Sequence, residues 1–205
     1  MAYDRQLIVV VHPAKAERRQ TLIDGARALK AAKSIENAVV LDPTAESVGL
    51  ATRRKFAALT AQSRLYLSCH GGTSLAGVQP EAMAAFLKLK CGLQAAGKIV
   101  VIACGSSVAM ETVQKFHAAL GNVYGIFTDV FGYLYPIKVI DHGDMELVAK
   151  LAEIGLRTLD FKLGERRLRL DDGTSLEARV RPRHVPVSKY VFAWVAGVQV
   201  FETVY

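Results

Sequence analysis

The sequence predicts an α/β fold in which helices cover both faces of a mostly parallel β-sheet. Short apolar runs of strand length alternate with longer stretches of helical spacing over residues 1–160. Strands that are apolar throughout are typical of parallel sheets buried on both faces. The chain has 205 residues, enough for one domain with a full core, and it is 51% hydrophobic and 22% charged.

The expected strands are apolar and stop at turn residues or glycines. Asp42-Pro43 stops the second strand, His70-Gly71-Gly72 follows the third, and Cys104-Gly105 follows the fourth. In chain order, the core strands are expected at Leu7–His12, Asn37–Leu41, Arg64–Ser68, Lys98–Ala103 and Gly125–Val130, with Tyr133–Ile140 as a further strand.

Helices are expected between these strands because apolar residues recur there at helical intervals. Leu22, Ala26 and Leu29 share one face of the first helix, and Pro80 suits the start of the third. The helices are expected at Lys15–Lys33, Ala45–Ala61, Glu81–Lys90, Val108–Leu120 and Asp144–Leu159.

Beyond residue 160 the pattern changes to paired strands. Asp171-Asp172-Gly173 and Ala196-Gly197 are turn signals between apolar runs. We expect residues 161–205 to form a β-rich extension of a single domain, not a second domain. Its hairpins are expected at Arg166–Leu170 with Ser175–Val180, and at Lys189–Val195 with Val198–Val204.

Charge and cysteine content narrow the classes of function. The net charge of +7 permits contact with an anionic ligand, but no nucleic-acid-binding motif is present and no nucleic-acid partner is expected. Three cysteines without a C-x-x-C pair predict a reducing compartment and no metal site. No apolar run suits a membrane span or signal peptide, so we expect a cytoplasmic protein, or one that a specialised secretion system delivers into a host cell.

Two reactive side chains follow consecutive core strands. His70 follows the third strand and Cys104 the fourth, about one strand–helix–strand unit further along the chain. If these strands are neighbours, both side chains emerge at the carboxyl edge of the sheet within several ångströms of each other. An imidazole can accept the proton of a thiol, and the resulting thiolate is a strong nucleophile. The pair therefore predicts nucleophilic catalysis.

The two strand-end segments resemble those of the caspase-like clan CD cysteine peptidases. Leu65–Gly72 and Ile99–Gly105 carry the resemblance, with histidine before cysteine as in that clan. The clan includes caspases, legumain, clostripain and gingipains. The self-processing domains of bacterial toxins and the related effector peptidases are the most similar members. The resemblance implies a caspase-hemoglobinase-like three-layer sandwich and a cysteine endopeptidase that acts on protein substrates, by self-processing or as an effector, without a cofactor for its chemistry.

The resemblance also assigns roles to individual residues. It implies Cys104 as the nucleophile, His70 as the general acid and base, and the backbone N–H groups of Gly71 and Cys104 as the oxyanion site. Where some members have an acid or amide after the first strand, this chain has His12. Two positions before the nucleophile, several members have a polar pocket residue, whereas this chain has Ile102, which favours an apolar or small residue before the scissile bond.

Further candidates lie near other strand ends and in the C-terminal region. Asp42 and Asp129 could line the substrate pocket, although a cap or turn role explains each of them better. Toxin self-processing domains bind inositol hexakisphosphate on a basic β-flap, which implies this compound as an activator. The anion-binding candidates are Arg166, Arg167, Arg169, Arg179, Arg181, Arg183 and Lys189, which also suit the solvated face of a hairpin.

The same residues exclude some alternative interpretations and leave others open. A tyrosine-phosphatase loop would need arginine where Met110 stands, and no phosphate-binding P-loop or G-x-S-x-G motif is present. Strand alternation should turn Cys69 away from His70, and a structural role is expected for Cys91 and His117. A catalytically inactive α/β domain that binds a nucleotide, a phosphate-rich ligand or a protein is the main alternative. The apolar C-terminal strands could also pair with a second copy of the chain.

Overall fold

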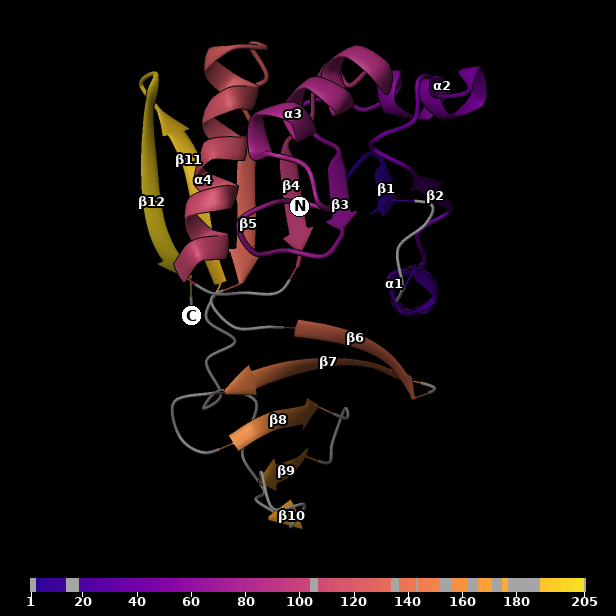
Figure 1. Cartoon of the computed structure of the whole chain (residues 1–205), viewed down its shortest axis with the longest axis vertical. Helices are drawn as coiled ribbons and strands as arrows, with labels where there is room; N and C mark the ends of the chain where they lie inside the picture. Colours follow the sequence, from indigo (N-terminus) through magenta and orange to yellow (C-terminus); the bar gives the residue numbers. More distant parts are fainter. Residues whose placement is uncertain are drawn as a thin grey trace.

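A computed structural model gives the fold of this chain. It describes residues 3–13, 19–103, 107–133, 137–142, 144–151, 156–161, 166–170, 175–176 and 189–204. Among these residues, a seven-stranded sheet carries the helices, and a separate five-stranded sheet is formed by the segment between its fifth and sixth strands in chain order (Figure 1).

The seven-stranded sheet has the strand order β2-β1-β3-β4-β5-β11-β12. The first five strands in this order run parallel, and β11 and β12 are added in antiparallel fashion beside β5. The α/β class with a mostly parallel sheet is therefore confirmed. The strands span Gln6–Val11 (β1), Asn37–Leu41 (β2), Arg64–Ser68 (β3), Lys98–Ile102 (β4), Asp129–Tyr133 (β5), Lys189–Val195 (β11) and Val198–Val204 (β12).

Helices cover both faces of this sheet, as the apolar strands predict. The helical segments are Arg19–Ala32 (α1), Leu50–Ala57 (α2), Pro80–Ala85 (α3) continued by a π-helical turn at Phe86–Lys90 (η1), and Ser107–Asn122 (α4). Ile8, Val10 and Tyr66 pack with α1 residues on one face. Alternate residues such as Leu65 and Leu67 pack with side chains of α2, α3 and α4 on the other face.

The fifth core strand begins later than the sequence pattern indicates. The expected start, Gly125, instead lies just beyond α4 and has a positive φ of +65°. Its N–H donates to the carbonyl of Gly121, and the N–H of Ile126 donates to that of Leu120, so both amides cap the helix. The strand therefore begins at Asp129.

The prediction of a helix at Asp144–Leu159 is wrong. Residues 144–151 form β7 and residues 156–161 form β8, within an antiparallel sheet of order β10-β9-β8-β7-β6. Apolar residues in this range recur at every second position (145, 147, 149 and 151), which suits a strand, and also at helical intervals. Pairing with a neighbouring strand on each side favours the strand. The other strands of this sheet are Ile137–His142 (β6), Arg166–Leu170 (β9) and Ser175–Leu176 (β10).

The C-terminal hairpin has the expected bounds. Val195 pairs with Val198 across a two-residue turn in which Ala196 and Gly197 have φ values of +49° and +79°. Two positive φ values suit the right-handed twist of a tight hairpin. This hairpin completes the core sheet through the pairing of β11 with β5. The first expected hairpin is confirmed for β9 and β10, while its continuation to Val180 lies outside the described residues.

Candidate active site

The strand order places a topological switch point between β1 and β3. The chain moves from β1 to β2 on one side and then returns to β3 on the other side. Ligand-binding crevices of open α/β sheets form at such points, outside the carboxyl ends of the strands. His12 directly follows β1, and His70 lies two residues beyond β3.

The two imidazoles are in contact at this point. Val10 of β1 is level with Ser68 of β3, and each histidine stands two residues further along its chain segment. Their ring centroids are 5.5 Å apart, with an angle of 67° between the ring planes. Side chains alternate between the two faces of a sheet, so both histidines are expected on the same face as Ile8, Val10 and Tyr66. This is the face that α1 covers.

Hydrogen bonds fix the position of His12. Only 1% of this residue is exposed, and its backbone N–H donates to the carbonyl of Leu41 over 2.9 Å. Its Nδ1 lies 2.7 Å from the carbonyl oxygen of Pro13. Because a carbonyl only accepts, the Nδ1 of His12 is the donor in this hydrogen bond.

The loop after His70 is held by three contacts. The N–H of Ala76 donates to the carbonyl of His70 over 2.8 Å, and Gly71 faces Leu75 in an antiparallel bridge. From α4, the hydroxyl of Thr112 donates to the carbonyl of Gly72 over 2.7 Å. This bridge is of the type whose hydrogen bonds are made by the residues on either side of the pair, here by His70 and Ala76. It therefore does not use the N–H of Gly71, which an oxyanion site would need. The sequence carries no signal for the Thr112 contact, because α4 reaches this loop only in the fold.

The end of β4 adjoins the end of β3. Ile102 is level with Ser68, and the N–H of Cys69 donates to the carbonyl of Ile102 over 3.1 Å. The Ile102 side chain is 8% exposed and belongs to the apolar cluster that packs with α1. Cys104 follows two residues later in the sequence and lies outside the described residues.

The two aspartates occupy different edges of the sheet. Asp42 follows β2 at the same edge as His12, where its Oδ1 accepts hydrogen bonds from the N–H and the hydroxyl of Thr44. These bonds form a turn. Asp129 starts β5 level with Lys98, at the opposite, amino-terminal edge. Burial raises the pKa of the Asp129 carboxyl, and Lys98 partly offsets this effect. The structure therefore does not bring Asp129 to the histidines.

Of the basic candidates, the structure describes four, which are divided between the two sheets. Arg166, Arg167 and Arg169 lie in β9 of the five-stranded sheet, where Arg167 is level with Asp160 of β8. Lys189 begins β11. The remaining candidates, Arg179, Arg181 and Arg183, lie outside the described residues.

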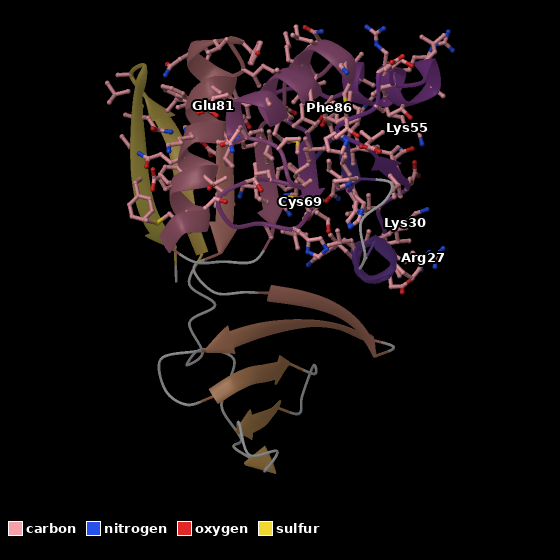
Figure 2. The ribbon with its side chains drawn as sticks, viewed as in Figure 1. Arg27, Lys30, Lys55, Cys69, Glu81 and Phe86 are labelled. Carbon is pink, nitrogen blue, oxygen red and sulfur yellow. The ribbon has the colours of Figure 1, made fainter. Side chains whose placement is uncertain are left out.

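The competing thiols lie in the opposite core. Cys69, which Figure 2 labels, is 2% exposed and belongs to the apolar cluster that includes side chains of α2, α3 and α4, whereas Tyr66 belongs to the other cluster. Cys91 is fully buried in the same cluster, and desolvation raises the pKa of its thiol to about 12 despite the nearby Arg53. At neutral pH, Cys91 is therefore an unreactive thiol.

His117 has a structural environment. Its Nε2–H donates to the carbonyl of Thr128 over 3.0 Å, and its Nδ1 accepts from the Gln199 amide over 2.6 Å. The ring stacks on Trp194 with a centroid distance of 4.9 Å. Burial lowers the pKa of the imidazole to about 4. His117 thus joins α4 to the C-terminal hairpin as a neutral ring.

Three findings concern metal ligands, membrane helices and known relatives. In the part of the chain that the structure describes, no three His, Cys, Asp or Glu side chains gather closely enough to hold a metal ion. The described helices include none with the length and apolar character needed to cross a bilayer. No protein-family model matches the chain, and no curated protein shows significant sequence similarity to it.

Proposed function

We propose that this chain is a cysteine endopeptidase of the caspase-like type, with His70 and Cys104 as its catalytic pair. The observation that carries the proposal is the level pairing of Ser68 with Ile102 on adjacent parallel strands. His70 and Cys104 each stand two residues beyond these partners in the sequence. Neighbouring strands are about 5 Å apart, a separation that an imidazole and a thiol can bridge.

The proposed reaction is acyl transfer followed by hydrolysis. His70 accepts the thiol proton of Cys104, and the thiolate attacks the carbonyl carbon of the scissile peptide bond. The N–H of Gly71 stabilises the negative oxygen of the tetrahedral intermediate, together with the N–H of Cys104. His70 then protonates the leaving amine. Finally, it removes a proton from the water that hydrolyses the thioester, which restores the free thiol.

The apolar surroundings of Ile102 favour a small or apolar residue before the scissile bond. Ile102 is buried among side chains of β1, β3 and α1, and His12 stands beside the general base. The Ile102 side chain offers no charge to a charged group of the substrate. The proposed substrates are proteins or peptides, cleaved in the chain's own cytoplasm or in a host cell, including self-processing.

Two further parts of the proposal concern an activator and a partner copy. Inositol hexakisphosphate is the proposed activator, bound by basic residues that include Arg166, Arg167 and Arg169. A second copy is the proposed partner of β12, which ends the sheet order and exposes 63% of Val198 and 49% of Phe201. Light scattering should then give the mass of a dimer, and Val198→Lys should weaken this dimer. Val123→Lys is the matched control, because Val123 is 68% exposed and follows α4.

Substitution of the nucleophile tests the peptidase function. Wild-type protein and Cys104→Ala are incubated with a peptide library and with themselves, and products are identified by mass spectrometry. We expect cleavage by the wild type only, and Cys91→Ala should cleave as the wild type does. Cleavage that persists in Cys104→Ala would rule out this nucleophile. A wild type that cleaves nothing, with and without inositol hexakisphosphate, would favour a binding domain instead.

A further inference from the structure

We propose that a cavity at the amino-terminal edge of the seven-stranded sheet binds a nucleoside phosphate. The cavity has a volume of about 460 Å³, which is within the range of pockets that hold small ligands. It lies between the residues that start β1, the turn that joins α1 to β2, and the end of α2. Figure 1 shows these elements together at one side of the sheet. The sequence alone does not indicate the cavity, because only the fold brings its three segments together.

The inner wall of the cavity is apolar, and an aromatic ring stands beside it. Leu7, Ile35 and Leu59 line the cavity and are each no more than 5% exposed, so the core fixes their positions. Tyr3 also lines the cavity, and Arg64 holds its ring. The Nη2 of Arg64 donates to the Tyr3 hydroxyl over 2.6 Å, and the guanidinium carbon lies 3.9 Å from the ring centroid. A fixed aromatic ring suits a nucleic-acid base, because bases stack on aromatic side chains.

Three cationic side chains line the same cavity. Arg5 directly precedes β1, and Arg54 and Lys55 lie in the last turn of α2. None of the three belongs to an ion pair found among the described residues, so their N–H groups are available to a ligand. Arginine and lysine form strong charge-assisted hydrogen bonds with phosphate oxygens. A phosphate monoester carries a charge of about −1.5 to −2 at pH 7, which three cations match better than a single carboxylate would.

The two carboxylates of the cavity have different environments. The oxygens of Asp4 accept hydrogen bonds from Thr60 over 2.6 Å and from Ser63 over 2.7 Å, and these bonds lower the pKa of the Asp4 carboxyl. Asp4 is therefore engaged within the chain. Glu36 is exposed and belongs to no ion pair found in the described ranges. Its carboxylate can accept hydrogen bonds from ribose hydroxyls, as acidic residues do in dinucleotide sites.

Side chains must supply the positive charge of this site. Both α1 and α2 end at this edge, and the C-terminus of a helix is the negative end of its dipole. Phosphate binding should therefore be lost when the cationic side chains are neutralised. His70 follows the carboxyl end of β3, at the opposite edge of the sheet, so ligand binding here does not depend on the proposed peptidase activity.

Calorimetry on the full chain with adenosine monophosphate tests the site. We expect one ligand per chain, and Arg54→Gln combined with Lys55→Gln should lower the affinity by roughly tenfold or more, because hydrogen bonds to a charged group are lost. Arg53→Gln is the matched control, since it removes a charge from the same helix outside the cavity lining, and it should bind as the wild type does. Unchanged affinity in the double variant, or an equal loss in Arg53→Gln, would overturn the proposal, with circular dichroism used to verify that each variant is folded.

Adenosine and ribose 5-phosphate separate the parts of the ligand. Adenosine has no phosphate, so it should bind more weakly than adenosine monophosphate and equally well to the wild type and the double variant. Ribose 5-phosphate has no base and should also bind more weakly. If it bound as tightly as adenosine monophosphate, the assignment of a nucleoside ligand would be wrong.

Two further variants test the role of Glu36 and the independence of the site. The wild type should bind 2′-deoxyadenosine monophosphate more weakly than adenosine monophosphate, and Glu36→Gln should reduce this difference, whereas the control Glu46→Gln should not. Cys104→Ala should bind adenosine monophosphate as the wild type does. Cleavage that persists in Cys104→Ala would contradict the peptidase alone, whereas absence of nucleotide binding to the wild type would contradict the cavity site alone.

Discussion

Ser68 of β3 and Ile102 of β4 are level partners on parallel strands, so the two strands leave the sheet at the same height. This relationship connects a pattern in the sequence with a chemical hypothesis, the pairing of His70 with Cys104. It depends on β3 and β4 being neighbours, which the strand order confirms. The reactivity of the thiols tests the hypothesis most directly.

Alkylation by iodoacetamide at pH 6.5 should modify Cys104 before the other thiols. An isolated thiol is only about 1% ionised at this pH, so an imidazole that accepts its proton can raise the rate many-fold. His70→Ala should slow modification of Cys104 by roughly tenfold or more. Peptide mapping by mass spectrometry measures each site, with the buried Cys91 as an internal control whose pKa is raised to about 12. An unchanged Cys104 rate in His70→Ala would contradict the pair.

Thr112→Val should loosen the loop that follows His70. The substitution keeps the shape of the side chain but removes the hydroxyl that donates to the carbonyl of Gly72 over 2.7 Å. Loss of one such bond costs about 1 kcal/mol. We expect faster amide hydrogen exchange across residues 71–78, measured by mass spectrometry. Thr52→Val in α2 is the control and should leave exchange in this loop unchanged.

Much of the core sheet could be predicted from the sequence because its strands are short apolar runs with clear stops. The bounds of β2, β3, β11 and β12 match the expected ranges, and a turn residue or glycine lies near each end. The prediction failed where two periods fit the same residues. In residues 144–151, apolar positions satisfy both a helix and a strand, and only pairing with β6 and β8 decides between them.

The candidate site was predictable only in part, for a topological reason. The positions of His70 and His12 after strands are visible in the sequence, but their contact requires β1 to lie between β2 and β3. Chain order does not specify that arrangement. Asp129 was expected near the carboxyl end of its strand, but β5 begins at this residue. Asp129 therefore lies at the amino-terminal edge of the sheet, away from the histidines.

Gly132→Ala should destabilise the fold by about 1–3 kcal/mol, the usual cost of overpacking a core. A Cβ at this position would lie 2.2 Å from the hydroxyl oxygen of Tyr190 and 2.3 Å from its ring carbon Cζ. Tyr190 is 1% exposed and packs against Phe192, so its ring cannot move aside freely. Urea unfolding measures the effect. Gly49→Ala is the control, because no atom lies within 4 Å of its added Cβ, and an equal loss there would contradict this explanation.

The stability that His117 contributes should fall as the pH is lowered. Burial lowers the pKa of this imidazole from 6.5 to about 4, so the folded state favours the neutral ring. Below pH 6.5 the unfolded chain takes up a proton that the folded chain does not. Stability is therefore lost progressively between pH 6.5 and 4, up to about 3 kcal/mol in total.

Comparison with His117→Phe isolates this effect. The variant keeps an aromatic ring beside Trp194 but loses the bonds to Thr128 and Gln199, and should be less stable than the wild type by about 2 kcal/mol at pH 7. At pH 5 the difference in free energy of unfolding should be smaller, because only the wild type must keep an imidazole neutral. Urea titrations at both pH values measure it. A difference that grows on acidification would mean that the folded state prefers the charged ring, against the burial and the hydrogen bonds that surround it.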